Sequence, residues 1–246
     1  MRYFIGNWKM FGVPKSINIL RKINSFASKD KNRKKYQIII TPPFTLLESF
    51  SKYLKSSNII IGSQNCYKKK QYSSDTGAVS SYMIKSVGIK HTLIGHSDNR
   101  AEGDTEIILK DKVKFALNNK LKVIYCVGEN RIQKQKKQTF SVIKRQLIKV
   151  LNKQYDKKNI IVAYEPIWSI GSGKIPSQNE LFKITIYIKK ILSKIFVKSP
   201  AVLYGGSVDE KNIKMLKEIP AIDGFLIGGA SKSSKKFIDI IKNYYR

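Results

Sequence analysis

The chain has 246 residues, 42% of them hydrophobic, which is enough apolar material for one large domain with a substantial core. No apolar run is long enough to span a bilayer and the first residues do not form a signal peptide, so we expect a cytoplasmic protein with no membrane partner. The formal net charge is +30, but the lysines are spread along the whole chain, which predicts a solvated basic surface and no specific nucleic-acid site.

Eight short apolar runs alternate with stretches of helical periodicity. The runs are Phe4–Gly6, Ile38–Ile40, Ile59–Ile61, Thr92–Ile94, Val123–Tyr125, Ile160–Tyr164, Val202–Tyr204 and Phe225–Ile227. Apolar strands alternating with helices predict a parallel sheet covered by helices, and eight such units predict a single α/β domain, a (β/α)8 barrel over residues 1–246. A doubly wound open sheet is the alternative, and it fits less well because no glycine-rich dinucleotide turn follows the first run.

In such a barrel the functional side chains follow the strand ends. Asn7 and Lys9 follow the first run, His96 follows the fourth, and Glu165 ends the sixth. His91, the other histidine, lies at the opposite end of the fourth run and is expected to be a structural residue whose hydrogen bonds are partly satisfied. A carboxylate and an imidazole without a metal cluster suit proton transfer next to a carbonyl group.

The segment after Glu165 predicts a mobile flap. Pro166 ends the strand because it has no N–H for the sheet, and Gly171 to Gly173 provide backbone freedom after an apolar tip. A base attached to such a flap can work when water is shut out.

The loops after the seventh and eighth runs predict a phosphate site. They contain Tyr204 to Ser207 and the pair Gly228 and Gly229, and glycines allow backbone N–H groups to approach an oxyanion. The two cysteines, Cys66 and Cys126, have no histidine at metal-binding spacing, so we expect reduced thiols in the core and no metal.

Six motifs in order resemble those of the triosephosphate isomerase family, and the likeness covers essentially the whole chain. They are Gly6–Met10, Ile94–Ser97, Cys126–Glu129, Ala163–Lys174, Tyr204–Val208 and Gly228–Ser231. The resemblance implies a TIM barrel and an isomerase of glycolysis and gluconeogenesis, which interconverts dihydroxyacetone phosphate and D-glyceraldehyde 3-phosphate. It also implies a homodimer, a small phosphorylated substrate and no cofactor.

The resemblance assigns roles to individual residues. Glu165 would move the proton between the two carbons and neutral His96 would polarise the enediolate oxygens, the roles for which this family is itself the standard example. Lys9 would supply positive charge and Asn7 would help to place the substrate. Backbone amides would hold the phosphate at Gly171, Ser207, Gly228 and Gly229.

The chain departs from the family pattern at several positions, which we interpret as lying at the subunit contact or the flap hinge and outside the chemistry. Asp98 and Asn99 replace Glu and Arg, Ala78 replaces a glutamate, and Phe11 replaces an asparagine. Pro176 stands where the family has a residue whose N–H bonds the tyrosine of the Tyr-Gly-Gly-Ser motif. Tyr204 is therefore expected to lack that partner, and its replacement by Phe to cost less activity than the family pattern suggests.

Two other functions are weighed. A decayed barrel kept for binding, for example of RNA, would require loss of Lys9, His96 or Glu165, and all three are present. An aldolase or another isomerase on a phosphate-binding barrel is the second alternative. An aldolase needs a Schiff-base lysine inside a strand, and the predicted strands contain none.

Overall fold

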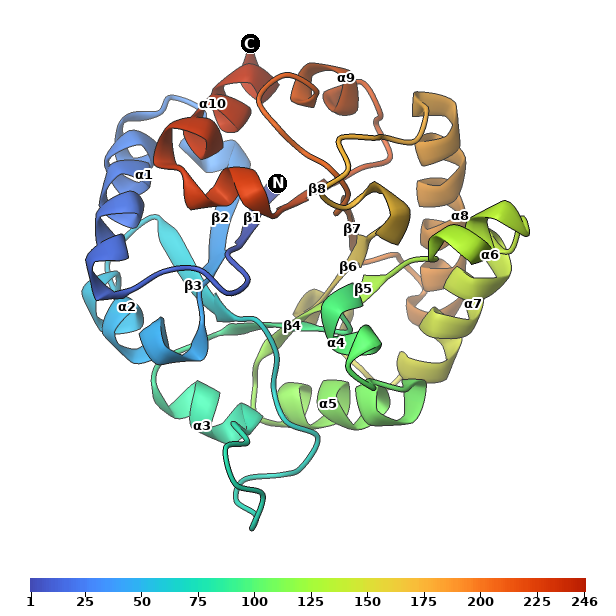
Figure 1. Cartoon of the computed structure of the whole chain (residues 1–246), viewed down its shortest axis with the longest axis horizontal. Helices are drawn as coiled ribbons and strands as arrows, with labels where there is room; N and C mark the ends of the chain where they lie inside the picture. Colours follow the sequence, from blue (N-terminus) through green and yellow to red (C-terminus); the bar gives the residue numbers. More distant parts are fainter.

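Eight parallel strands close into a barrel in the computed structural model, which describes residues 1–246. All eight apolar runs form strands, with bounds wider by at most a few residues, and neighbours in sequence pair around the ring (Figure 1). The strands are β1 (Arg2–Asn7), β2 (Tyr36–Thr41), β3 (Ile59–Ser63), β4 (His91–Ile94), β5 (Lys122–Val127), β6 (Ile160–Tyr164), β7 (Ala201–Tyr204) and β8 (Gly224–Ile227).

The pairing of β1 with β8 closes the ring and excludes the open sheet. Tyr3 lies in register with Gly224, and a Cβ on this glycine would lie only 2.3 Å from the Tyr3 carbonyl oxygen. The seam therefore requires glycine at this position. Side chains inside the ring form a core of nine buried residues: Ile5, Ile39, Leu93, Ile124, Cys126, Ile161, Ala163, Leu203 and Leu226.

Helices cover the outer face of the barrel, and their apolar sides join the strands in a second core of 50 buried residues. Serine and threonine begin several of them, for example Ser177, whose hydroxyl accepts the Glu180 N–H. No helix is long and apolar enough to cross a membrane. The helices are α1 (Ile17–Lys29), α2 (Leu47–Tyr53), α3 (Ser81–Ser86), α4 (Ser97–Ala101), α5 (Glu106–Asn118), α6 (Arg131–Gln135), α7 (Thr139–Val150), α8 (Gln178–Phe196), α9 (Ile213–Lys217) and α10 (Ser234–Tyr245).

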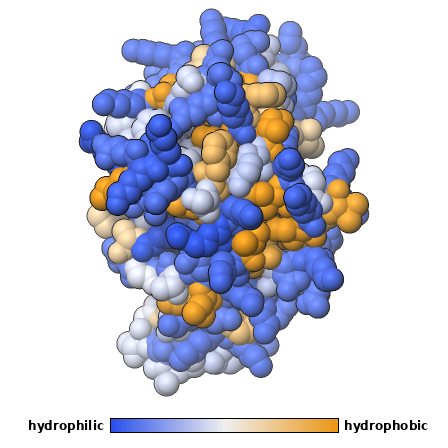
Figure 2. Space-filling model, turned by 90° about the vertical axis from the view of Figure 1, so that its right-hand side faces the viewer, coloured by the Kyte–Doolittle hydropathy of each residue, from blue (hydrophilic) through white to orange (hydrophobic).

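The basic side chains lie mainly on the surface, as the sequence predicts. Figure 2 shows the outer face around α6 to α8 as mostly hydrophilic, with scattered apolar side chains. Lys112 is the exception, because it is buried and its Nζ lies 2.8 Å from both carboxylate oxygens of Asp104. It also donates to Asn65 Oδ1 at 3.1 Å. The bond to Asn65 fixes α5 to the start of the segment between β3 and α3.

That segment, residues 64–80 (here called the arm), projects beyond the ring of helices (Figure 1). Internal contacts hold its shape: the Tyr67 hydroxyl donates to Asp75 at 2.9 Å, and Lys69 lies 2.6 Å from the same carboxylate. Tyr72, at the exposed end of the arm, stacks edge-on against Tyr82. These contacts give the arm a defined shape on the outside of the barrel.

His91 begins β4, so it lies at the end of the barrel where the strands start, and it is buried there. The opposite end, at the carboxyl ends of the strands, is here called the mouth. The sequence interpretation expected a structural histidine with partly satisfied hydrogen bonds, and in the structure its Nδ1 has no partner. Burial lowers the pKa of His91 to about 4, and the positive charges of Lys122, Lys90 and Lys85 add to this effect. The folded protein therefore holds His91 neutral at pH values where an unfolded chain binds a proton.

This difference predicts a loss of stability in mild acid. The pKa of His91 is 6.5 in its ordinary state and about 4 in the fold, so the unfolded state takes up the proton first as the pH falls through this window. Between pH 7 and pH 4.5 the penalty is about 2–3 kcal/mol. Urea unfolding of the wild type and of His91→Gln at fixed protein concentration measures it. We expect the wild type to lose more stability than the variant by this amount, and parallel losses would contradict the prediction.

Candidate active site

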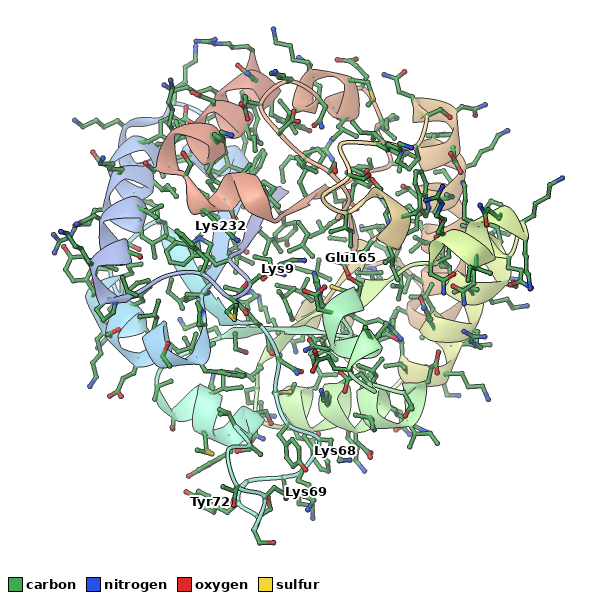
Figure 3. All side chains as sticks on the ribbon, in the orientation of Figure 1. Lys9, Lys68, Lys69, Tyr72, Glu165 and Lys232 are labelled. Carbon is green, nitrogen blue, oxygen red and sulfur yellow. The ribbon has the colours of Figure 1, made fainter.

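A cavity of about 560 Å³ opens at the carboxyl ends of the strands. In Figure 3 Lys9 and Glu165 face each other across the centre of the barrel at this end. The cavity is lined by all eight residues that the sequence singled out: Asn7, Lys9, His96, Glu165, Gly171, Ser207, Gly228 and Gly229. The closed ring thus brings together residues from five separate loops.

Glu165 directly follows β6 and is 3% exposed. Its Oε1 lies 3.3 Å from His96 Nε2, and its Oε2 accepts the Ser97 N–H at 3.4 Å. Burial raises the pKa of the Glu165 carboxyl, and the neighbouring His96, the Ser97 N–H and Lys9 oppose this rise. A buried carboxylate with a raised pKa and few hydrogen bonds is a stronger base than one in water.

His96 is the N-cap residue immediately before α4, and its ring position is set by the backbone. The Asp98 N–H donates to His96 Nδ1 at 3.1 Å, so Nδ1 is an acceptor. The proton of the neutral ring must therefore lie on Nε2, which points into the cavity beside Glu165. The imidazole can donate a hydrogen bond to an oxygen of a bound molecule.

Lys9 lies on a strained stretch of backbone. Its φ angle is 54°, in the left-handed region that non-glycine residues rarely adopt. Two contacts hold it there: the Lys9 N–H donates to Asn7 Oδ1 at 3.0 Å, and Gln64 Nε2 donates to the Lys9 carbonyl at 2.8 Å. Strain of this kind persists where the surroundings impose it, and it is concentrated at functional sites. Asn7 thus helps to position the lysine.

The part of the cavity that is bordered by the loops after β7 and β8 has space for an anion. A Cβ atom on Gly228 or Gly229 would meet no atom within 4 Å, so the backbone there borders free space. Ser207 and Lys236 also line this cavity. Glycine backbone next to a lysine suits a phosphate group.

Residues 166–176, here called the lid, border the cavity through Ile170, Gly171 and Gly173. At the entry of the lid, Trp168 Nε1 donates to Glu129 Oε1 at 2.9 Å, and the Tyr164 hydroxyl bonds both oxygens of the same carboxylate at 3.2 Å. Burial raises the pKa of Glu129, and the hydrogen bonds from Trp168 and Tyr164 oppose the rise. Further along the lid, the Gly173 N–H donates to Ser207 Oγ at 3.3 Å. The lid is therefore fastened at both ends of its tip.

One interpretation from the sequence is wrong in the structure, and one residue has a partner that the sequence did not indicate. Asp98 was placed outside the chemistry, yet its carboxylate lies 3.2 Å from Lys9 Nζ and its N–H orients His96. Tyr204 was expected to lack only the backbone N–H partner that Pro176 cannot provide. Its hydroxyl instead lies 3.2 Å from Ser169 Oγ. In both cases a short side chain reaches a group that lies far away in the sequence.

Three further residues shape the site without having been singled out. Asp98 lies two residues after His96, and a carboxylate in the first turn of α4 could have been suspected from that position. Glu129 lies in a motif that was noted without a role. Gln64, which holds the backbone of Lys9, carries no signal in the sequence.

The arrangement suits proton transfer without a metal. No group of three or more His, Cys, Asp or Glu side chains in the structure could hold a metal ion. A buried carboxylate, an imidazole N–H and an ammonium group face one small cavity, next to an anion-binding side. This set can remove a proton beside a carbonyl group and stabilise the negative charge that develops on its oxygen.

Comparisons of the sequence and of the fold with known proteins lead to one family. A profile of the family described as Triosephosphate isomerase matches residues 2–244. The chain is 36% identical to the triosephosphate isomerase of Borrelia garinii over 250 residues, which cover 98% of each chain, and 34% identical to that of Geotalea uraniireducens over 245 residues, with 96% of each covered. The crystal structure of triosephosphate isomerase from Bartonella henselae superposes with a TM-score of 0.91 at 31% identity, covering 100% of this chain and 99% of that one.

Proposed function

Because the chain belongs to the triosephosphate isomerase family, we propose that the residues lining its mouth cavity perform the steps of that family's reaction. The reaction is the interconversion of dihydroxyacetone phosphate and D-glyceraldehyde 3-phosphate, a step of glycolysis. The observation that carries the assignment of roles is the meeting of Glu165, His96 and Lys9 in one cavity of about 560 Å³.

In the proposed mechanism, Glu165 removes a proton from the carbon next to the carbonyl group. The electron pair of the C–H bond moves toward the carbonyl oxygen and forms an enediolate. His96 donates the Nε2 hydrogen bond to the enediolate oxygens, while Lys9 stabilises the negative charge. The hydroxyl proton on the oxygen of the first carbon passes to the former carbonyl oxygen, a transfer between two atoms that both lie within reach of His96 Nε2 in the proposal. Glu165 then returns its proton to the neighbouring carbon, so the enzyme ends unchanged and no cofactor is needed.

The phosphate group is proposed to lie between the lid and the ends of β7 and β8. Backbone N–H groups of Gly171, Ser207, Gly228 and Gly229 would bind its oxygens, and Asn7 would help to place the reacting end. The support is that these positions border the same side of the cavity and that the glycines leave it open. Fixing the phosphate places the reacting carbons next to Glu165.

A coupled assay of triose phosphate interconversion tests the function directly. Purified wild-type protein should convert each triose phosphate into the other, and a coupling enzyme that consumes the product should be the only other enzyme required in the assay. Glu165→Asp is the control, because it keeps the carboxylate but draws it back by one methylene group. A wild type without activity would contradict the proposal, and activity unaffected in Glu165→Asp would contradict the role of Glu165.

The alternatives are less well supported. The aldolase requires a lysine inside the barrel, and the only lysine within a strand is Lys122, which is exposed at the start of β5, away from the cavity. A decayed barrel kept for RNA binding would not require Lys9, His96 and Glu165 to remain together.

We also propose a cytoplasmic location, where the two free cysteines stay reduced.

We further propose a homodimer in which the arm docks onto a second copy of the chain. Met10 is 99% exposed beside the mouth and Tyr72 is 75% exposed on the arm, so both offer apolar surface to a partner. Phe11 is partly buried and packs edge-on against Trp8, with 5.5 Å between the ring centroids, so it supports this surface from below. The resemblance implies an ion pair across the subunit contact, between a glutamate at the position of Ala78 and an arginine at the position of Asn99, and both ends are missing here. The apolar contacts are proposed to hold the dimer without this ion pair.

The missing ion pair gives a testable prediction for the dimer. Asn99→Arg should weaken the dimer, because the new charge would face Ala78 of the second copy, which cannot pair with it. We expect a roughly tenfold to hundredfold rise in the dimer Kd, as for a partly buried unpaired charge. Adding Ala78→Glu should recover much of the loss. Sedimentation of both single variants and the double variant measures the coupling. A monomeric wild type or simply additive effects would contradict it.

A further inference from the structure

Ser169 lies at the centre of the lid and is fully buried. Its Oγ lies 2.6 Å from the Lys174 carbonyl oxygen and 3.2 Å from the Tyr204 hydroxyl. The Ser207 N–H also points at this oxygen, at 3.5 Å. One small hydroxyl thus contacts the far side of the lid, the end of β7 and the loop that follows it.

The direction of these hydrogen bonds follows from counting protons. A serine hydroxyl has one proton to donate, and the geometry assigns it to the Lys174 carbonyl. Tyr204 must therefore be the donor in its contact with Ser169. Burial raises the pKa of Tyr204 to about 12, against a lowering by the bond to Ser169, so the phenol keeps its proton at neutral pH. Ser169 Oγ thus serves as one donor and as the acceptor for Tyr204.

The backbone beside Ser169 is held as well. Ser207 Oγ donates to the Ser169 carbonyl at 2.7 Å. The two hydroxyls also pack tightly against Gly206, since a Cβ there would lie 2.2 Å from the Tyr204 hydroxyl and 2.8 Å from Ser169 Oγ. Position 206 therefore has room only for glycine, and the hydroxyl pair is enclosed on this side.

The exit of the lid cannot supply an equivalent contact through Pro176, which has no N–H. We propose that Ser169 is the positioning residue that latches the lid of this protein, by accepting the Tyr204 hydroxyl while it braces the lid through Lys174. In the latched state Glu165 is shielded from water. The inference rests on the proposed function, because shielding matters to a reaction that passes through an enediolate.

A latch of this kind affects more than the rate. When the lid opens too early, the enediolate can lose its phosphate: the bond between carbon and the bridging oxygen breaks, and its electron pair leaves with inorganic phosphate. The remaining enol rearranges to methylglyoxal, so no further reactant is needed. Inorganic phosphate released per isomerisation therefore reports on the latch. A change that only destabilised the barrel would leave this ratio unchanged.

The experiment compares Ser169→Ala, Tyr204→Phe and the double variant with the wild type. We expect each single variant to lower kcat/KM roughly fivefold to thirtyfold, the range for a buried hydroxyl that loses its partner. Each should also raise the phosphate released per isomerisation. The double variant should be about as impaired as the single ones, because the two hydroxyls act as one contact. Thr185→Val is the matched control, since it removes a buried hydroxyl that donates to the Leu181 carbonyl at 2.7 Å on α8. It should keep the wild-type ratio.

Three results would overturn the inference while leaving the proposed function intact, provided the wild type isomerises. Ser169→Ala could match the wild type in kcat/KM and in phosphate release. It could lose activity without releasing more phosphate, which would indicate a merely structural role. The two single effects could multiply in the double variant, which would show that the hydroxyls act independently. An inactive wild type would instead remove the proposed function itself.

Discussion

Replacing Glu165 by alanine is expected to lower kcat by a factor of about 10³ or more. The Glu165 carboxylate lies beside His96 Nε2, on the side of the ring that faces the cavity, whereas Asp98 lies beside Nδ1 on the other side. Burial also raises the pKa of Glu165, which favours its role as the base. A factor of 10³ corresponds to about 4 kcal/mol in the barrier. The fold should persist, because Glu165 contributes little to either hydrophobic core. Steady-state kinetics and a thermal unfolding curve measure the two effects separately.

Glu165→Gln provides the matched control for this prediction. It keeps the shape of the side chain and an oxygen that can accept the Ser97 N–H, but it cannot accept the substrate proton. It should therefore be as inactive as the alanine variant. If either variant retained more than a tenth of the wild-type kcat, Glu165 would not be the base.

The second large effect is expected for His96→Gln. The Nε2–H bond to the substrate oxygen strengthens as negative charge develops, so its loss should lower kcat by about 10²- to 10³-fold and leave KM nearly unchanged. The ring is held by the Asp98 N–H at 3.1 Å, which a flexible glutamine cannot reproduce. Initial rates over a range of substrate concentrations separate the two parameters.

His91→Gln is the control for His96→Gln, because the two histidines lie at opposite ends of β4. His91 is buried away from the cavity and should affect stability alone. We therefore expect wild-type kcat for His91→Gln at neutral pH. A His96 variant whose defect lay wholly in KM would show that the imidazole binds the ground state and the transition state equally.

The barrel could be predicted because its signal is local and repeated. Each strand is a short apolar run buried on both faces, and the ends of these runs agree with the structure within a few residues, as for Ile160–Tyr164. Once eight parallel strands close, their carboxyl ends must share one mouth. For this reason the sequence is sufficient to assign residues that follow the strands closely, such as Lys9, His96 and Glu165, to one site.

The contacts that orient these side chains could not be predicted in the same way. The tautomer of His96 depends on a backbone N–H two residues away, and the left-handed backbone of Lys9 depends on Gln64, which lies 55 residues further along the chain. The carboxylate of Asp98 reaches Lys9 only because β1 and β4 end at the same mouth. Such contacts leave no periodic trace in the sequence.

The sequence by itself determined the number of strands, their order and the strand ends at which the reactive side chains lie, because each of these follows from local patterns of burial and from the closure of a parallel sheet. Only the tertiary structure decided which groups those side chains touch. The partner of Tyr204 illustrates the difference: Pro176 correctly predicted the loss of one contact, while the hydroxyl of Ser169, 35 residues away, became visible only when the lid was folded onto β7. A hydrogen bond depends on positions within a few tenths of an ångström, and the packing of the whole barrel sets those positions.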